Sequence, residues 1–279
     1  MFKLFEKKTL ATLLALVSLS TINSISAQDC CPSDCNRFYI GGFGGEAYSG
    51  GSTRLIQQGT AFFTEAQGGP LAVNARGNSH KRTTSGFGGG QIGFELRQCG
   101  FGFSNLSLTP GAEIEAYFFR HNKKGHLINP TVRLTEHNFV DTFPMRVGVY
   151  FFNGVLSLNS CCFPLITPYI AGGVGAARIS IRNAKSLQVE PPEAGVNHFD
   201  SDRSDTSWAF AAQAKAGLRF NILERVHIFG EYRYLYIDSS NYIFGSTVAE
   251  GHAPTSPWNV EVKSLHYNAF AVGLQFDLY

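Results

Sequence analysis

The chain has 279 residues, with 23 lysines and arginines against 21 aspartates and glutamates. This length allows one large all-β domain or two domains of ordinary size. The 30 glycines, 24 phenylalanines and 11 tyrosines favour curved, aromatic-rich strands, and a mean hydropathy of -0.05 argues against a helical membrane protein. The near balance of charges gives no reason to expect nucleic acid as a partner.

Residues 1–27 have the features of a secretory signal peptide. Three lysines precede the apolar run Leu10–Leu19, and the small residues Ser24, Ser26 and Ala27 form a cleavage site. The run is too short for a membrane-spanning helix, although a retained N-terminal anchor is the alternative. Export would place the protein in an oxidising compartment, where its six cysteines would form disulfides. Residues 28–36 are a short Cys-rich segment, and residues 37–279 form the remaining domain.

Residues 37–279 contain segments in which apolar and polar residues alternate with the period of a β-strand. In chain order, the predicted strands are residues 37–48, 86–97, 109–120, 143–152, 168–181, 208–220, 225–237 and 266–279. Polar stretches without an apolar period separate them and are predicted to be loops, the longest being residues 49–85, 121–138, 183–205 and 238–263. The first strand is rich in glycine, which suits tight curvature.

Long and short connections alternate along the chain. With a periplasmic N-terminus, every long connection would lie outside the cell and every short turn in the periplasm, as in outer-membrane barrels. Eight strands of roughly 9–11 residues match a tilted membrane strand. We therefore predict an all-β fold, an eight-stranded antiparallel up-and-down transmembrane β-barrel in the bacterial outer membrane. A soluble β-sandwich is the alternative, but it would not need ionisable residues at so many inward positions.

Four stretches resemble the small outer-membrane β-barrel family that includes opacity proteins and the barrel of outer membrane protein A. They are Phe38–Gly45, Pro168–Gly175, Gly217–Tyr234 and Val272–Phe276. The resemblance implies outer-membrane lipid and lipopolysaccharide as surroundings and insertion by the outer-membrane assembly machinery, which reads the C-terminal strand. No peptidoglycan-binding domain is expected after this strand. The implied assembly signal consists of Phe270, Val272, Leu274, Phe276, Leu278 and Tyr279.

Charged residues occupy the polar parity of most predicted strands, which we expect to face the lumen. An eight-stranded barrel has an interior just wide enough for side chains to fill it. Charges of both signs would then compensate one another and plug the lumen, while a narrow porin-like channel for small solutes is the alternative. The predicted lumen network consists of Glu95, Arg97, Glu113, Glu115, Arg146, Arg178, Arg182, Lys215, Arg219, Glu231 and Arg233, with Glu46 added from the first strand.

The topology places all six cysteines at the periplasmic rim. Adjacent cysteines pair with each other only under strain, so each is expected to find a partner elsewhere. Intramolecular staples under the barrel are one outcome, and cross-links to other envelope proteins are another. The second outcome resembles the disulfide-linked envelopes of chlamydial-type bacteria, and zinc binding is a third reading. The candidates are Cys30, Cys31, Cys35, Cys99, Cys161 and Cys162.

The first two long loops are basic and the last two are acidic. Lys81, Arg82, Lys123 and Lys124 are candidates for binding host-surface glycans or lipopolysaccharide phosphates. The alternative for these four side chains is ordinary solvated loop charge.

The sequence favours a non-enzymatic protein. Ser264 and His266 could pair a hydroxyl nucleophile with a base, as a lipid A-modifying barrel would need, but no positioned carboxylate is evident. We assign no catalytic residue, cofactor or metal site. The expected function is structural, serving envelope integrity, with surface adhesion through the outer loops and a small-solute channel as the alternative.

Overall fold

The computed structural model describes residues 36–49, 52–79, 83–96, 101–103, 106–134, 137–160 and 162–278. All of them belong to one unit of the chain, residues 33–279. The predicted signal peptide and all but Asn36 of the predicted Cys-rich segment lie outside the described residues, so both remain predictions. In the part of the chain that is described, no helix is long and apolar enough to cross a membrane.

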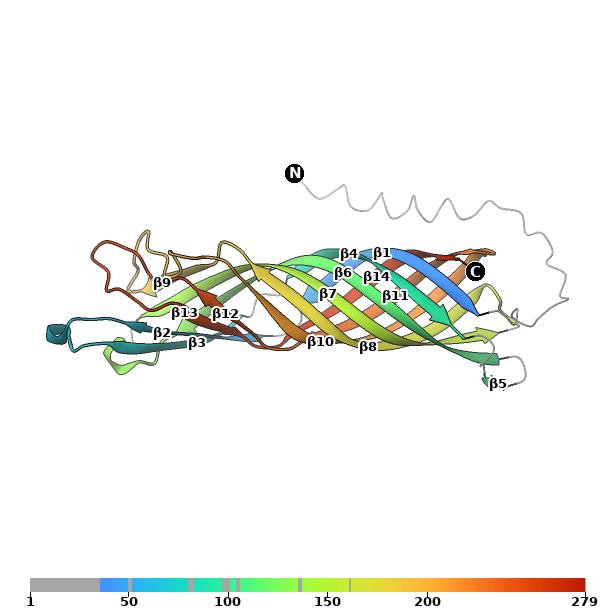
Figure 1. The fold of residues 1–279 in the computed structure, drawn as a ribbon, viewed down its shortest axis with the longest axis horizontal. Coiled ribbons are helices and arrows are strands. Elements are labelled where there is room, and N and C mark those ends of the chain that lie inside the picture. The colour runs from blue at the N-terminus through green and yellow to red at the C-terminus, as the bar shows by residue number, and fades with distance from the viewer. Residues whose placement is uncertain are drawn as a thin grey trace, which may run out of the picture. The chain divides into compact units, whose positions relative to one another are not determined.

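Eight antiparallel strands pair side by side and close into a ring (Figure 1). The last strand pairs with the first from Asp277 opposite Tyr39 to Tyr267 opposite Ser49, so the ring has no free edge. This confirms the predicted eight-stranded antiparallel barrel. Its strands are β1 (Arg37–Ser49), β4 (Thr84–Glu95), β6 (Leu106–Ile128), β7 (Asn138–Ser160), β8 (Ile166–Ile181), β10 (Asp205–Leu223), β11 (Val226–Ile237) and β14 (Leu265–Asp277).

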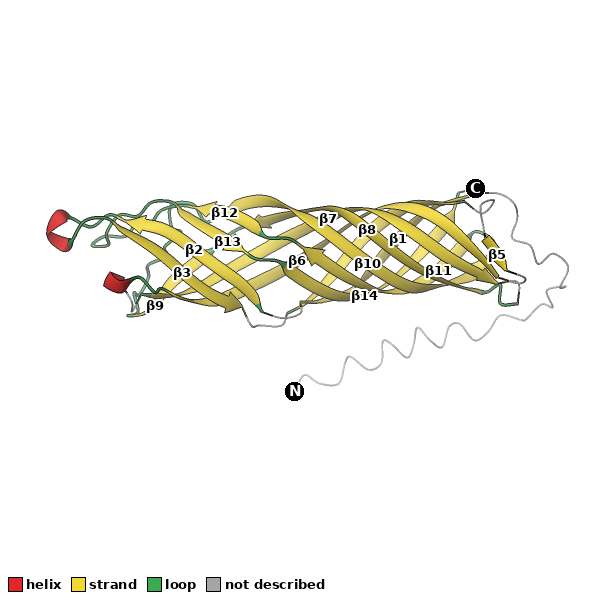
Figure 2. Ribbon diagram, turned by 90° about the horizontal axis from the view of Figure 1, so that it is seen from below, coloured by secondary structure: helices red, strands yellow, loops and turns green. Residues whose placement is uncertain are grey.

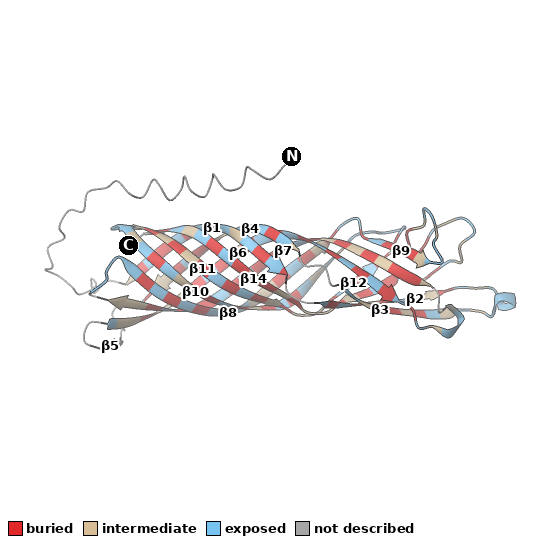
Figure 3. Cartoon of the chain, turned by 180° about the vertical axis from the view of Figure 1, so that it is seen from behind, coloured by how far each residue is buried: buried red, intermediate tan, exposed pale blue. Residues whose placement is uncertain are grey.

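The outer face of the ring carries a band of exposed apolar side chains. Ile114 is 66% exposed, Val272 is 64% exposed, and similar residues occur on every strand of the ring. Buried and exposed positions alternate along the strands, as the checkered colouring of Figure 3 shows. So much exposed apolar surface around a closed ring would be unfavourable in water and suits the hydrocarbon of a bilayer. The fold is therefore a transmembrane β-barrel.

Three short turns join ring strands at one end of the barrel, the turn end, where β5 (Phe101–Phe103) also pairs with β6. At the other end the sheet continues into an extension, drawn in Figure 2 beyond the ring. The extension is made of the far ends of β6 and β7 together with β2 (Thr53–Ala61), β3 (Leu71–Ser79), β9 (Lys185–Glu190), β12 (Ser240–Phe244) and β13 (Trp258–Val262). Two short 3₁₀ helices, η1 (Glu65–Gln67) and η3 (Val132–Leu134), lie in its connections.

The prediction that the four long connections are loops is wrong. Each contributes strand residues to the extension, and β6 and β7 run for 23 residues each, well beyond the length expected for a membrane strand. The cause is an apolar core that continues from the lumen into the extension, where it includes Leu55, Phe143 and Trp258. Burial of these side chains stabilises strands outside the bilayer in the way that it stabilises a soluble β-sheet protein.

Closure of the ring depends on a close approach of backbones at Gly45. A Cβ atom there would lie 1.9 Å from the carbonyl oxygen of Phe270 on β14, whereas a Cβ at Gly42 would find its nearest neighbour at 3.9 Å. We expect Gly45→Ala to destabilise the folded barrel by about 1–3 kcal/mol, the usual range for overpacking. Urea unfolding followed by heat-modifiable gel mobility measures this, with Gly42→Ala as the matched control. Equal stability of the two variants would contradict the observed β1–β14 pairing.

Candidate functional site

The lumen holds a buried cluster of charges centred on Lys215 of β10. Its Nζ atom lies 2.6 Å from Glu113 Oε1 and 2.5 Å from Glu115 Oε2, and Glu231 Oε2 is 3.9 Å away. Arg233 of β11 forms ion pairs with Glu115, at 2.5 Å, and with Glu231. Two cations and three carboxylates thus meet in a space closed to solvent.

A second group of charges lies nearer the turn end of the lumen. Arg219 Nη2 contacts Glu95 Oε1 at 2.9 Å, and Arg37 Nη1 contacts Glu95 Oε2 at 3.1 Å. Arg37 Nε also donates to Asp277 Oδ1 at 2.5 Å, and His227 Nε2 lies 3.0 Å from the other oxygen of Asp277. Arg37 was missed in the sequence because it stands at the start of the first predicted strand. Its shared parity with the inward Tyr39 was the available signal.

Neutral donors add further hydrogen bonds to the buried carboxylates. The Tyr39 hydroxyl donates to Glu113 at 2.9 Å, the Tyr169 hydroxyl to Glu231 at 2.8 Å, and the Ser157 hydroxyl to Glu95 at 2.9 Å. Hydrogen bonds of this kind are what make a buried ion pair tolerable, because unpaired charge in a low-dielectric interior costs several kcal/mol.

Aromatic rings cover the ionic cluster on the side of the extension. The Arg233 guanidinium lies 4.0 Å from the centre of the Phe43 ring, a cation–π contact. Phe87 and Tyr117 pack at 5.4 Å between ring centres, and Phe119 packs against Tyr267 at 5.1 Å. Aliphatic side chains follow towards the extension, among them Met145, Val147 and Val149. Side chains therefore occupy the lumen from the ionic cluster to the core of the extension.

The structure places the predicted lumen residues on two different faces. Those that lie inside and are buried are Glu95, Glu113, Glu115, Lys215, Arg219, Glu231 and Arg233. Arg97 lies outside the described residues.

The predicted inward orientation of Arg146, Arg178 and Arg182 is wrong, as is that of Glu46. All four side chains are exposed on the outer face, while the apolar residues between them point inward. The reason is that the face carrying the apolar side chains changes from the outer one to the inner one where the barrel leaves the bilayer. Outside the bilayer the interior is an apolar core and the outer face meets water. In that part of an alternating strand, the apolar residues are therefore the ones that point inward.

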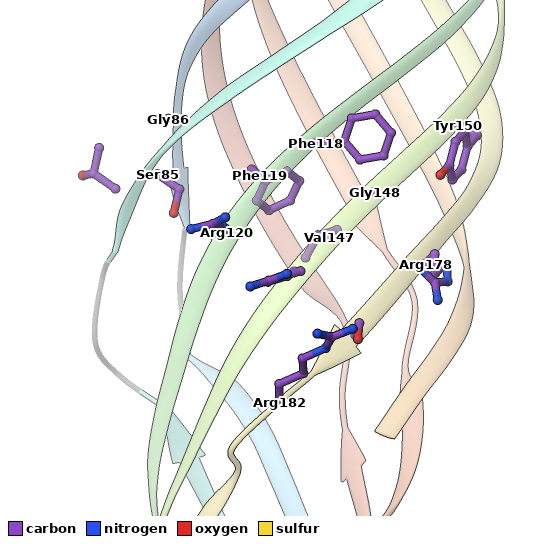
Figure 4. Close-up of a pocket in the computed structure, with 13 residues that line it drawn as sticks. Ser85, Gly86, Phe118, Phe119, Arg120, Val147, Gly148, Tyr150, Arg178 and Arg182 are labelled. Atoms are coloured by element: carbon purple, nitrogen blue, oxygen red, sulfur yellow. The ribbon is translucent and has the colours of Figure 1, made fainter. Parts of the chain in front are cut away.

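The three displaced arginines join Arg120 around a hollow of about 570 Å³ on the outer face of β6, β7 and β8 (Figure 4). Phe118 and Tyr150 line the same hollow on the bilayer side. Arg120 stands directly opposite Arg146 in the β6–β7 ladder. Like charges in that position repel, and within the described ranges none of the four arginines contacts a carboxylate. The hollow, which we call the arginine hollow, is therefore suited to an anion.

The predicted loop-binding residues do not form a common surface in the described structure. Lys123 is buried on the inner face of β6, whereas Lys124 is exposed on the outer face. The prediction that Lys123 binds glycans is therefore wrong, because glycans could not reach its buried side chain. Lys81 and Arg82 lie outside the described residues.

The described cysteines and the last strand bear on two further predictions. Of the six cysteines only Cys162 lies among the described residues, at the exposed turn after β7, so the predicted pairings stay predictions.

The predicted assembly residues Phe270, Val272, Leu274, Phe276 and Leu278 are all exposed on the outer face, and Tyr279 lies outside the described residues.

The Ser264 and His266 side chains do lie close together. Ser264 Oγ is 3.4 Å from His266 Nε2, and the Tyr234 hydroxyl lies 2.8 Å from His266 Nδ1. A phenol thus stands where a hydrolytic triad has a carboxylate, so the imidazole has no negative partner there to stabilise its protonated form.

His198 is a buried imidazole in the extension, between Phe139 at 5.0 Å and Trp258 at 6.1 Å between ring centres. Burial, with a smaller contribution from the nearby His252 and His137, lowers the pKa of His198 to about 4. The ring is therefore neutral at neutral pH.

No family model matches the chain, and no curated protein matches it in sequence. Solved structures with a similar fold include Neisserial surface protein A, with 10% identity, a TM-score of 0.34, and coverage of 86% of this chain and 97% of that one. The outer membrane protease OmpT from Escherichia coli has 8% identity and a TM-score of 0.38, and the match covers 91% of this chain and 100% of that one. The outer membrane protein OprG from Pseudomonas aeruginosa has 13% identity and a TM-score of 0.35, and the match covers 89% of this chain and 99% of that one. At these values the fold class rests on the strand pairing of this chain itself.

Proposed function

We propose that the protein is a non-conducting structural barrel of the bacterial outer membrane, with its extension outside the cell. The filled lumen is the observation that carries this proposal. Four cationic side chains, Arg37, Lys215, Arg219 and Arg233, form ion pairs with buried carboxylates, and aromatic rings cover the cluster around Lys215 and Arg233 on the side of the extension. A channel needs an open path along its axis, whereas buried side chains of the described residues occupy this one.

Conductance separates the structural role from the channel that is its alternative. The protein, refolded and with its thiols alkylated, is inserted into planar lipid bilayers, and a general porin in the same bilayers serves as the positive control. We expect no steady unitary conductance, because ions would have to break several buried ion pairs to pass. Stable current steps that increase with salt concentration would contradict the proposal.

The arginine hollow favours a second role, binding of phosphorylated lipid in the outer leaflet. Guanidinium groups bind phosphate oxygens in bidentate fashion, and the aromatic side chains beneath them suit the interfacial level of a bilayer. A phosphate between Arg120 and Arg146 would turn their repulsion into two attractive contacts. Lipopolysaccharide, whose headgroup carries phosphates over acyl chains, has this chemistry.

Replacing Arg120, Arg146, Arg178 and Arg182 by glutamine tests the lipid role. Each basic residue near an anionic surface contributes about 1 kcal/mol, so we expect the variant to bind diphosphorylated lipid A at least roughly tenfold more weakly. Binding of dephosphorylated lipid A should not change. Arg54→Gln, at an exposed position of the extension, is the matched control. Unchanged binding of the phosphorylated lipid by the fourfold variant would remove this role.

Other expected partners rest on the sequence. Recognition of the last strand by the outer-membrane assembly machinery is supported by its five outward apolar side chains. Binding of host glycans by Lys81, Arg82 and Lys124, and disulfides to other envelope proteins, stay predictions.

A further inference from the structure

Two loops of the extension bring together three side chains that are far apart in the sequence. Glu193 and His198 lie between β9 and β10, and His252 lies between β12 and β13. One ligand atom from each lies within 4.8 Å of the others. Glu193 Oε2 is 3.8 Å from His198 Nε2 and 3.7 Å from His252 Nε2. These separations are too long for hydrogen bonds.

The orientation of both imidazoles is fixed by their other nitrogen. His198 Nδ1 donates to the backbone carbonyl of Ser186 at 3.2 Å, and His252 Nδ1 donates to the carbonyl of Ala253 at 2.6 Å. Each Nδ1 is therefore a donor to a carbonyl oxygen, and each Nε2 lies near the same carboxylate oxygen, Glu193 Oε2. Metal-binding histidines usually donate one ring N–H to a carbonyl or carboxylate oxygen, and this hydrogen bond orients the other ring nitrogen towards the metal.

The carboxylate oxygen at the centre of this group has no hydrogen-bond donor. Glu193 Oε2 is shielded from solvent and accepts no hydrogen bond within the described part of the chain. A shielded carboxylate oxygen without a hydrogen-bond donor is costly. A divalent cation between the three ligand atoms would supply the missing positive charge.

From this geometry we propose that Glu193, His198 and His252 form a binding site for a divalent transition-metal ion of the Zn²⁺ class. Two histidines and one glutamate are a known zinc ligand set, with water completing the tetrahedron. Metal–ligand distances of about 2.0–2.1 Å place neighbouring ligand atoms roughly 3.3 Å apart, so the observed oxygen–nitrogen separations need to shorten only slightly. The two imidazole nitrogens favour such an ion over Ca²⁺ and Mg²⁺, which prefer sites made of oxygen ligands alone.

The metal would join two loops that otherwise meet through a few polar contacts. The Thr247 hydroxyl donates to the backbone carbonyl of His198 at 3.2 Å, and Ser201 N donates to the carbonyl of Ser246 at 3.2 Å. A coordination bond from each loop to one ion would restrict their separation. Bound metal should therefore protect residues 191–204 and 245–257 from proteolysis.

The test is calorimetric titration of ZnCl₂ into the refolded, tag-free protein, with its thiols alkylated so that cysteines cannot bind the metal. We expect one Zn²⁺ per chain. Because changes outside the ligands alone typically weaken metal binding by about 10–100-fold, Glu193→Gln and His252→Gln should each weaken it by roughly 100-fold or more. Zinc should slow cleavage of the two loops in the unchanged protein and in neither variant.

The matched control is His126→Gln, which removes an exposed imidazole from the outer face of β6 and should leave zinc affinity unchanged. In a Trp208→Phe background, fluorescence of Trp258, which packs against His198, checks that the metal-free variants keep the fold of the extension. Absence of stoichiometric binding, or variants with intact Trp258 fluorescence that bind zinc as tightly as the unchanged protein, would overturn the proposal.

Discussion

The barrel depends on mutual compensation of the charges in its lumen. Removing lysine, arginine and glutamate side chains from water costs several kcal/mol for each ion, and only close partners of opposite sign repay that cost. In this chain several partners come from strands that face each other across the lumen. Glu95 of β4, for example, pairs with Arg219 of β10 as well as with Arg37 of the neighbouring β1, and Lys215 of β10 pairs with Glu113 and Glu115 of β6. These pairs across the lumen form only when the ring closes with the observed register.

A second constraint acts where the barrel leaves the bilayer. Within the bilayer, lipid selects apolar side chains on the outside and leaves the interior to polar ones. In the extension, where water surrounds the strands, polar side chains lie outside and apolar ones inside, so β7 buries Phe143 and exposes Arg146. The arginine hollow lies at this inversion, because β6, β7 and β8 change from one pattern to the other there. One pair of long strands thus supports both a membrane barrel and an apolar core outside it.

The sequence was sufficient to predict the closed ring and the inward parity of most charged residues. Clean alternation on β4, β6, β10 and β14 marked both faces, since those stretches lie mainly within the bilayer. It was insufficient on β7 and β8, where alternation alone cannot tell whether lipid or water lies outside. The strands of the extension were missed because their apolar residues are scattered among glycines and polar residues. The group of Glu193, His198 and His252 has no local motif, since only folding brings its two loops together.

A double-mutant cycle on Arg219 and Glu95 tests charge compensation most directly, because their side chains meet at 2.9 Å with both buried. Urea unfolding in detergent micelles would be measured for Arg219→Met, for Glu95→Gln and for the double variant. Glu95→Gln leaves the Arg219 guanidinium without its carboxylate partner and should cost about 3–5 kcal/mol. Arg219→Met should cost less, because Glu95 keeps Arg37, and the double variant should lose clearly less than the sum of the two. Additive losses, or single variants as stable as the unchanged protein, would contradict the account.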